Sequence, residues 1–276
     1  MKVVVCTPTK NRRWAWKFSK SCMDAQIRKP DLWIVLDNST CPADDWSVSK
    51  DCSYVEYHRI YGERPIGELR NMCLDLALKA GAEYIAFWDD DDYYPPTRIS
   101  SGIAALEKNP TADISGSSKM FLLLTRENVL MTTGPFNEKH ATAATWTIRR
   151  NYAEKHRFNP EKKRGEELDF TEKWNANMIQ IPAEEVIVVM GHSKNTVDKS
   201  VLLKTPKVFL AEVVNADNGK MAFRIRWPVR WDIWKSTFSD VECVPPQDYI
   251  QSEVSQTVVV PILHTEDTGV SGEHHA

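Results

Sequence analysis

The chain has 276 residues, and its 35 Lys and Arg residues against 38 Asp and Glu residues give a formal net charge of −3 at pH 7. This balance gives no sign of a polyanionic partner, and we expect no nucleic acid among its ligands. Hydrophobic residues make up 42% of the chain and charged residues 26%, which excludes a disordered or fibrous protein. No apolar run approaches the roughly 20 residues that cross a bilayer, so no transmembrane segment is predicted.

The start of the chain lacks the apolar core and the cleavage site of a signal peptide, which predicts a cytoplasmic protein. Its six cysteines show neither a C-x-x-C pair nor a metal-binding spacing, so we expect reduced thiols. A Cys41–Cys52 disulfide is the alternative in an oxidising compartment. Nothing in the sequence fixes the oligomeric state, and an oligomer is possible.

Apolar runs alternate with amphipathic segments along the first 112 residues. Strands are predicted at residues 2–6, 32–36, 54–59 and 83–88. Helical spacing of apolar residues follows Trp14, continues from Ile66 to Ala80, and returns after Pro95-Pro96. This alternation predicts an α/β fold with a mainly parallel sheet that helices cover on both faces.

The pattern becomes strand-rich after residue 112. Strands are expected at residues 120–125, 129–133, 141–148 and 186–190, and helices at 149–156 and 166–176. Beyond residue 200, an Asn218-Gly219 turn predicts a β-hairpin between residues 208–214 and 221–227. We therefore expect a main domain over residues 1–200 and a small β-rich C-terminal extension over 201–276, ending in a polar tail.

Three polar clusters follow three predicted strands, at residues 7–11, 37–40 and 89–92. The carboxyl ends of parallel strands meet at one edge of a sheet, so the clusters should converge. The last cluster is four consecutive aspartates. Two carboxylates about 4 Å apart repel by roughly 4 kcal/mol at an effective dielectric constant near 20, which favours a bound cation. Oxygen ligands suit Mg²⁺ or Mn²⁺; the alternative is a solvated acidic turn.

Four motifs in order resemble the family 2 glycosyltransferases with the GT-A fold. They are VVVCTPTKNR at residues 3–12, DNS at 37–39, IGELRN at 66–71 and FWDDDD at 87–92. The resemblance covers roughly residues 1–195. It implies metal-dependent, inverting transfer of a sugar from a nucleoside diphosphate to a hydroxyl of a glycan or another acceptor. It also implies a nucleotide-sugar half over residues 1–112 and an acceptor half over 113–200.

The resemblance assigns the donor side of the site residue by residue. It implies that a UDP-sugar is held by Thr7, Pro8, Thr9, Asn11, Asp37, Arg70, Asp90 and Lys194, with Asp37 accepting a hydrogen bond from the base. The implied metal ligands are Asp89, Asp91 and His192, with Asp91 the first choice and Asp90 or Asp92 able to share its role. The alternatives are a turn-forming Asp37 that bonds its own backbone, a surface charge at Arg70 and a structural His192.

The acceptor side carries the implied general base. Glu167 stands where the family has the Asp of a Gly-Glu-Asp motif, and Glu166 and Asp169 are the other candidates. Acidic residues also favour helix N-termini without any catalytic role. His140 and Trp146 are candidates to line the acceptor side, Trp146 as a stacking platform, and the alternative for both is a core or loop position.

The C-terminal tryptophans suit an intramolecular or subunit contact; they are Trp227, Trp231 and Trp234. Two other functions remain open at this level. A sugar-phosphate nucleotidyltransferase shares the fold but wants a glycine-rich loop after the first strand, which residues 7–12 lack. A non-catalytic carbohydrate-binding protein would suit the ten tryptophans but would not need the acidic residues.

Overall fold

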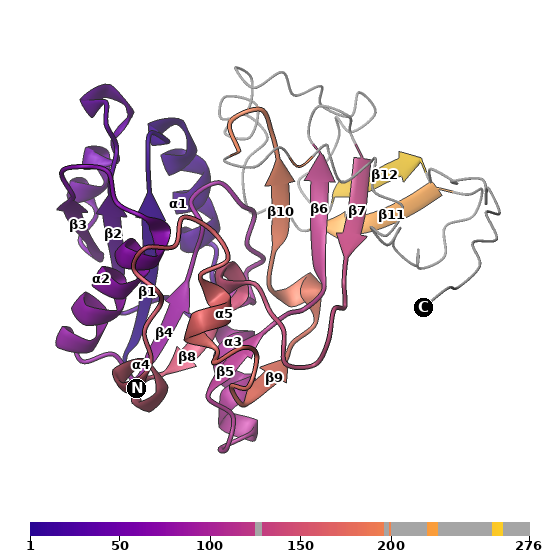
Figure 1. The fold of residues 1–276 in the computed structure, drawn as a ribbon. Coiled ribbons are helices and arrows are strands. Elements are labelled where there is room, and N and C mark those ends of the chain that lie inside the picture. The colour runs from indigo at the N-terminus through magenta and orange to yellow at the C-terminus, as the bar shows by residue number, and fades with distance from the viewer. Residues whose placement is uncertain (125–128, 196–198, 200–219, 226–255, 262–276) are drawn as a thin grey trace, which may run out of the picture.

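The structure is a computed structural model that describes residues 1–124, 129–195, 199, 220–225 and 256–261 (Figure 1). Its strands are β1 Val3–Thr9, β2 Leu32–Asp37, β3 Val55–Arg59, β4 Tyr84–Phe87, β5 Ile114–Gly116, β6 Met120–Leu124, β7 Val129–Thr133, β8 Thr147–Arg149, β9 Met178–Gln180, β10 Val188–Gly191, β11 Lys220–Ile225 and β12 Gln256–Pro261. Its α-helices are α1 Trp16–Asp24, α2 Ile66–Lys79, α3 Arg98–Lys108, α4 Arg150–Lys155 and α5 Glu167–Phe170. Short 3₁₀ helices span Arg13–Ala15, Pro42–Asp44, Ser47–Asp51, Ala143–Thr145 and Ala183–Glu185.

A seven-stranded sheet in the order β3-β2-β1-β4-β8-β5-β9 forms the centre of the fold. The strands from β3 to β4 are parallel, and β8 runs antiparallel to both of its neighbours. A second sheet has the order β10-β6-β7, and β11 pairs with β12 in a third (Figure 1). The predicted mixed, mainly parallel α/β architecture is therefore confirmed.

Alternate residues of the central strands face two separate cores. On one face, Val3 and Val5 pack with the apolar residues of α1 and α3. On the other face, Val4 and Cys6 pack with α2 and α4. Because both faces are covered, the strands are apolar throughout, which is the pattern that made them recognisable in the sequence.

Several predicted elements differ from the structure. The strand expected at 141–148 is limited to β8, because the 3₁₀ helix Ala143–Thr145 precedes it. The helix expected at 166–176 ends at Phe170, because Glu172, Lys173 and Trp174 adopt positive φ angles of 50°, 59° and 66°. The partner of β11 is β12, whereas residues 208–214 of the expected hairpin lie outside the described part of the chain, as do the tryptophans at 227, 231 and 234.

Two smaller expectations concern cysteines and membranes. Cys41 and Cys52 are both free thiols, so they do not form the alternative disulfide. Among the helices of the described residues, none combines the length and the apolarity that a bilayer span requires.

Candidate active site

The three polar clusters meet at the carboxyl ends of β1, β2 and β4, as predicted. Thr9, the last residue of β1, donates a hydrogen bond from Oγ1 to Oδ2 of Asp90 at 2.6 Å. The next loop joins the cluster after β2, because the Asn11 backbone N–H donates to Ser39 Oγ at 2.7 Å and Asn11 Oδ1 accepts from the Thr40 backbone N–H at 2.8 Å. Asn11 holds this position with a positive φ of 56°.

The four aspartates after β4 do not face a common point. Asp90, Asp91 and Asp92 are buried, and two of them, Asp90 and Asp91, share a partner. Asp92 Oδ1 accepts a hydrogen bond from the Met190 backbone N–H at 2.9 Å, which fixes the acidic turn to β10. Asp89 is the most exposed of the four, with 33% of its side chain accessible, and its Oδ1 lies 3.5 Å from Nη2 of Arg70. Neighbouring positions of a turn thus serve different structural roles.

Asp90 and Asp91 share one guanidinium. Nη1 of Arg12 lies 2.5 Å from Asp90 Oδ1 and 2.8 Å from Asp91 Oδ2. Asp91 Oδ2 also lies 3.1 Å from His192 Nε2 and accepts from Asn195 Nδ2 at 3.2 Å. The sequence predicts a bound cation beside adjacent carboxylates. In this structure the Arg12 guanidinium contacts both of them.

The predicted metal ligands Asp89, Asp91 and His192 have different contacts in this structure, and their role stays a prediction. Over residues 1–124 and 129–195, no three His, Cys, Asp or Glu side chains are grouped in a way that could hold a metal ion. Asp89 points to Arg70, whereas Asp91 and His192 contact each other. A carboxylate oxygen and an imidazole nitrogen are ligands that suit Mn²⁺, so the pair of Asp91 and His192 fits a divalent cation.

Burial and charge shift the pKa values of these carboxyl groups in opposite directions. Burial, together with repulsion from Asp91, raises the pKa of Asp90 and of Asp92. Burial acts on Asp91 in the same sense, but Arg12 and His192 outweigh it and lower its pKa. Asp91 is therefore the carboxylate of the turn that is best stabilised in its charged form.

Arg70 connects the acidic turn to the second predicted cluster. Its Nε donates to Glu166 Oε1 at 2.8 Å, and both side chains are almost fully buried, with 6% and 5% accessible. The guanidinium lies over the rings of Phe87 and Phe158 at 5.0 and 5.9 Å, and its Nη1 atom has no hydrogen-bond partner. Arg70 is thus a buried charge that joins α2, the end of β4 and the start of α5, not a surface charge.

Glu167 follows at the first position of α5 and is partly buried. Burial and the neighbouring Glu166 raise its pKa, whereas Arg70 opposes the shift. Asp169, two residues further on, is exposed. Of the three predicted base candidates, Glu166 is occupied by Arg70, Asp169 faces solvent, and Glu167 has the environment of a carboxylate with a raised proton affinity.

A close backbone approach positions this segment. Gly67, in the first turn of α2, donates from its N–H to the Lys162 carbonyl at 3.1 Å, and a Cβ at this position would lie 2.0 Å from the Asn159 carbonyl oxygen. Only glycine allows the contact without movement. Gly165 then turns the chain into α5 with a positive φ of 68°.

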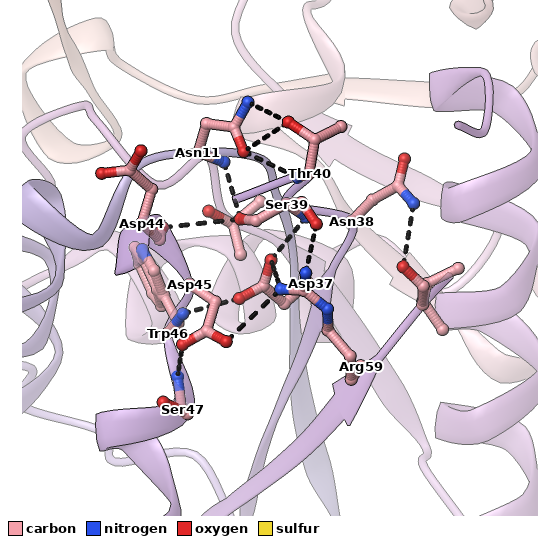
Figure 2. Close-up of polar contacts among 12 residues, drawn as sticks. Asn11, Asp37, Asn38, Ser39, Thr40, Asp44, Asp45, Trp46, Ser47 and Arg59 are labelled. Carbon is pink, nitrogen blue, oxygen red and sulfur yellow. Dashed lines mark hydrogen bonds and ion pairs between the residues drawn. The ribbon is translucent and has the colours of Figure 1, made fainter. Parts of the chain in front are cut away.

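Asp37 organises the loop after β2 (Figure 2). Its Oδ1 accepts from the Ser39 backbone N–H at 2.8 Å, and its Oδ2 accepts from the Trp46 backbone N–H at 2.6 Å and from the Tyr57 hydroxyl at 3.2 Å. Arg59 Nη1 lies 3.5 Å from Asp37 Oδ1, and the Asp37 side chain is fully buried. These contacts correspond to the alternative given above, a turn-forming aspartate, and the predicted role of Asp37 in binding the base stays a prediction.

Other predicted donor residues also have structural partners. Thr7 and Pro8 belong to β1 instead of the loop, and Thr7 Oγ1 is buried against the Trp33 indole N–H at 2.9 Å. Pro8 is tolerated in a central strand because the pairing of β1 with β4 ends at Cys6. Lys194 Nζ lies 5.4 Å from the Trp14 ring centroid, and its backbone N–H donates to His192 Nδ1 at 3.2 Å.

The predicted acceptor-side residues divide in the same way. Trp146 is fully buried and stacks on Phe158 and Phe170, so its expected role as a stacking platform is wrong. His140 is half-buried, lies 4.4 Å from the Trp174 ring centroid, and has an unpartnered Nδ1. Sequence analysis missed Arg12 and Asn195 as members of the site, although Arg12 ends the first motif and Asn195 follows His192 by three positions.

The fold can be compared with solved structures. S. aureus TarS 1-349 in complex with UDP-GlcNAc matches with a TM-score of 0.54 and 20% identity, over 72% of this chain and 61% of that chain. The mannosyltransferase PcManGT from Pyrobaculum calidifontis, in complex with GDP-Man and Mn²⁺, matches with a TM-score of 0.51 and 14% identity, over 74% and 60%. The chain therefore spans about 61% of the length of TarS 1-349. These likenesses define the GT-A fold.

The sequence adds the family to the fold. Residues 4–165, more than half of the chain, match the family model described as Glycosyl transferase family 2. No curated protein matches the sequence. The chain belongs to glycosyltransferase family 2, as the four motifs indicated.

Proposed function

We propose that this protein is an inverting glycosyltransferase that moves a sugar from a nucleoside diphosphate, with UDP favoured, to a hydroxyl of a glycan or another acceptor. Family membership supports the transferase activity. The complexes of TarS with UDP-GlcNAc and with UDP support the choice of UDP. The complex of PcManGT with GDP-Man makes GDP the nucleotide to compare with it.

One observation carries the proposal. Arg70 contacts Asp89 at 3.5 Å on one side and Glu166 at 2.8 Å on the other. The acidic turn after β4 and the segment that carries Glu167 therefore adjoin the same buried guanidinium. A donor placed at the acidic turn would lie next to a carboxylate that can serve as a base.

Glu167 takes the proton of the acceptor hydroxyl in the proposed reaction. The acceptor oxygen forms a bond to the anomeric carbon, the bond to the diphosphate oxygen breaks, and attack from the opposite side inverts the configuration. A raised pKa suits this role because it gives the carboxylate a higher proton affinity than an exposed glutamate has.

Asp91 and His192 would hold Mn²⁺ or Mg²⁺. Such a cation, when bound, stabilises the negative charge of the departing nucleoside diphosphate. Asp90 would remain with Thr9 at the edge of the same turn.

The first experiment incubates the purified protein with a panel of UDP- and GDP-sugars and measures release of the nucleoside diphosphate with Mn²⁺, with Mg²⁺ and with EDTA. We expect metal-dependent release from one donor. Without an acceptor, the enzyme can hydrolyse its donor too slowly to detect. Calorimetric titrations with UDP and GDP in the presence of Mn²⁺ therefore accompany the panel. If no donor is cleaved and neither nucleotide binds, the proposal is wrong. Once an acceptor is known, the anomeric configuration of the product by NMR tests inversion.

The same panel separates the two alternative functions. A sugar-phosphate nucleotidyltransferase would release pyrophosphate from a nucleoside triphosphate and a sugar phosphate. A non-catalytic carbohydrate-binding protein would keep its sugar affinity in Asp91→Ala, whereas a transferase would lose turnover.

A further inference from the structure

Arg12 occupies the acidic pair where a cation is expected. One nitrogen, Nη1, contacts Asp90 Oδ1 at 2.5 Å and Asp91 Oδ2 at 2.8 Å. Charge-assisted contacts of this length are the strong kind of hydrogen bond in proteins. The guanidinium therefore offsets part of the negative charge of the two carboxylates.

The Arg12 contact falls on the same oxygen that faces the imidazole. Asp91 Oδ2 accepts from Arg12, from Asn195 Nδ2 at 3.2 Å, and lies 3.1 Å from His192 Nε2. A divalent cation between Asp91 and His192 would have to approach this oxygen. Two positive groups at one carboxylate oxygen repel each other, so the metal and the guanidinium exclude one another there.

The backbone of Arg12 is held by hydrogen bonds, but its side chain is partly exposed to solvent. The Arg12 carbonyl accepts a hydrogen bond from the Trp46 indole N–H at 2.7 Å. The preceding residue, Asn11, forms hydrogen bonds with Ser39 and Thr40. The Arg12 side chain is 17% accessible, in contrast to the deeply buried Asp90. Rotation of the side chain toward solvent would free Asp91 without moving the loop.

We propose that Arg12 is an internal competitor of the divalent cation, bound to Asp90 and Asp91 when the site holds no metal and released from Asp91 when Mn²⁺ or Mg²⁺ binds. The inference rests on the proposed function, because it takes Asp91 and His192 as the cation-binding pair. It explains how two adjacent buried carboxylates are stabilised whenever the site holds no metal.

The experiment titrates Mn²⁺ into the 276-residue chain and measures free Mn²⁺ by electron paramagnetic resonance. The apparent affinity for a ligand falls by the fraction of the protein in the competent state. If Arg12 occupies the pair about nine-tenths of the time, Arg12→Gln should bind Mn²⁺ about tenfold more tightly than wild type. Arg12→Lys, which keeps the charge but lacks the planar fork, should lie between them. Arg13→Gln, an exposed neighbour with the same charge change, is the control and should match wild type.

Thermal unfolding gives an independent readout of the same coupling, since linkage is reciprocal. Arg12→Gln should lower the midpoint of unfolding in EDTA, and saturating Mn²⁺ should remove most of that difference from wild type. The measurement also shows that the variant is folded, and Arg12→Lys serves if it is not.

Two results would overturn the inference. The first is equal or weaker Mn²⁺ binding by Arg12→Gln, with the same thermal loss in EDTA and in Mn²⁺, which describes an ion pair that persists beside the metal. The second is the absence of Mn²⁺ binding by both proteins, which also removes the metal from the proposed function. UDP binding in EDTA then reports separately on whether the protein is still a nucleotide-sugar enzyme.

Discussion

The buried pair of Arg70 and Glu166 gives a prediction whose size follows from the structure. Glu166→Ala removes the partner that lies 2.8 Å from Arg70 Nε, while 94% of the arginine side chain remains inaccessible. Breaking a buried pair by removing one partner costs about 3–5 kcal/mol. Asp89 stays within 3.5 Å of the guanidinium and compensates part of the charge. We therefore expect a loss of about 3 kcal/mol in the free energy of unfolding.

The chain contains a matched control for this prediction. Arg64 and Glu68 form the same kind of contact at the same distance, 2.8 Å, at the start of α2, but with 46% and 32% of their side chains accessible. Exposed pairs of this kind contribute about 0.3–0.5 kcal/mol. Glu68→Ala should therefore change stability little, although the charge, the distance and the partner residue types are the same.

Thermal and urea unfolding, followed by circular dichroism, measure both variants. For a protein of this size, 1 kcal/mol corresponds to about 2–4 °C, so Glu166→Ala should lower the midpoint by about 6–12 °C. Arg70→Met combined with Glu166→Ala should cost less than the sum of the single variants, because the buried guanidinium is removed together with its carboxylate. A Glu166→Ala loss no larger than that of Glu68→Ala would refute the reasoning.

Three further predictions concern the base, the acidic turn and the glycine contact. A catalytic Glu167 must be deprotonated, so turnover should fall as the pH drops through a pKa above 4.5. Glu166→Gln removes the repulsion from Glu166 and should therefore move this acidic limb of the pH–rate profile to lower pH. A shift to higher pH would contradict the assignment. Asp91→Asn should weaken Mn²⁺ binding by at least about tenfold in calorimetry, since it removes the charged ligand, whereas the exposed Asp75→Asn should not; equal affinities would exclude Asp91 as a ligand. Gly67→Ala places a Cβ 2.0 Å from the Asn159 carbonyl oxygen and should cost about 1–3 kcal/mol in urea unfolding, and an unchanged midpoint would show that the contact is not tight.

The part of the fold that sequence could predict is the part with a clear hydrophobic period. The strands β1, β2 and β4 are buried on both faces and stand out as apolar runs. The strands β5 and β9 have three residues each and are too short to show a period. The sequence also carries no sign of where α5 ends, because the three residues with positive φ that follow it are neither glycine nor asparagine.

The candidate site shows a similar division. Motif order correctly located the polar clusters, since the topology of a parallel sheet brings strand ends together. It could not tell which way each side chain points. In the structure, Asp37 holds its own loop, Trp146 is a core residue, and Asp89 contacts Arg70 whereas Asp91 contacts Arg12. Arg12 was missed because a basic residue at the end of a loop carries no signal of its distant partners.

The role of Glu167 is the central claim, and one comparison tests it most directly. Turnover of the donor identified in the panel is measured for wild type, Glu167→Gln and Asp169→Asn, together with UDP affinity for each. The two variants make the same chemical change two positions apart, at a partly buried and at an exposed residue. We predict that Glu167→Gln loses at least about a hundredfold in sugar transfer while keeping its UDP affinity, and that Asp169→Asn matches wild type. Full transfer activity in Glu167→Gln would contradict the account.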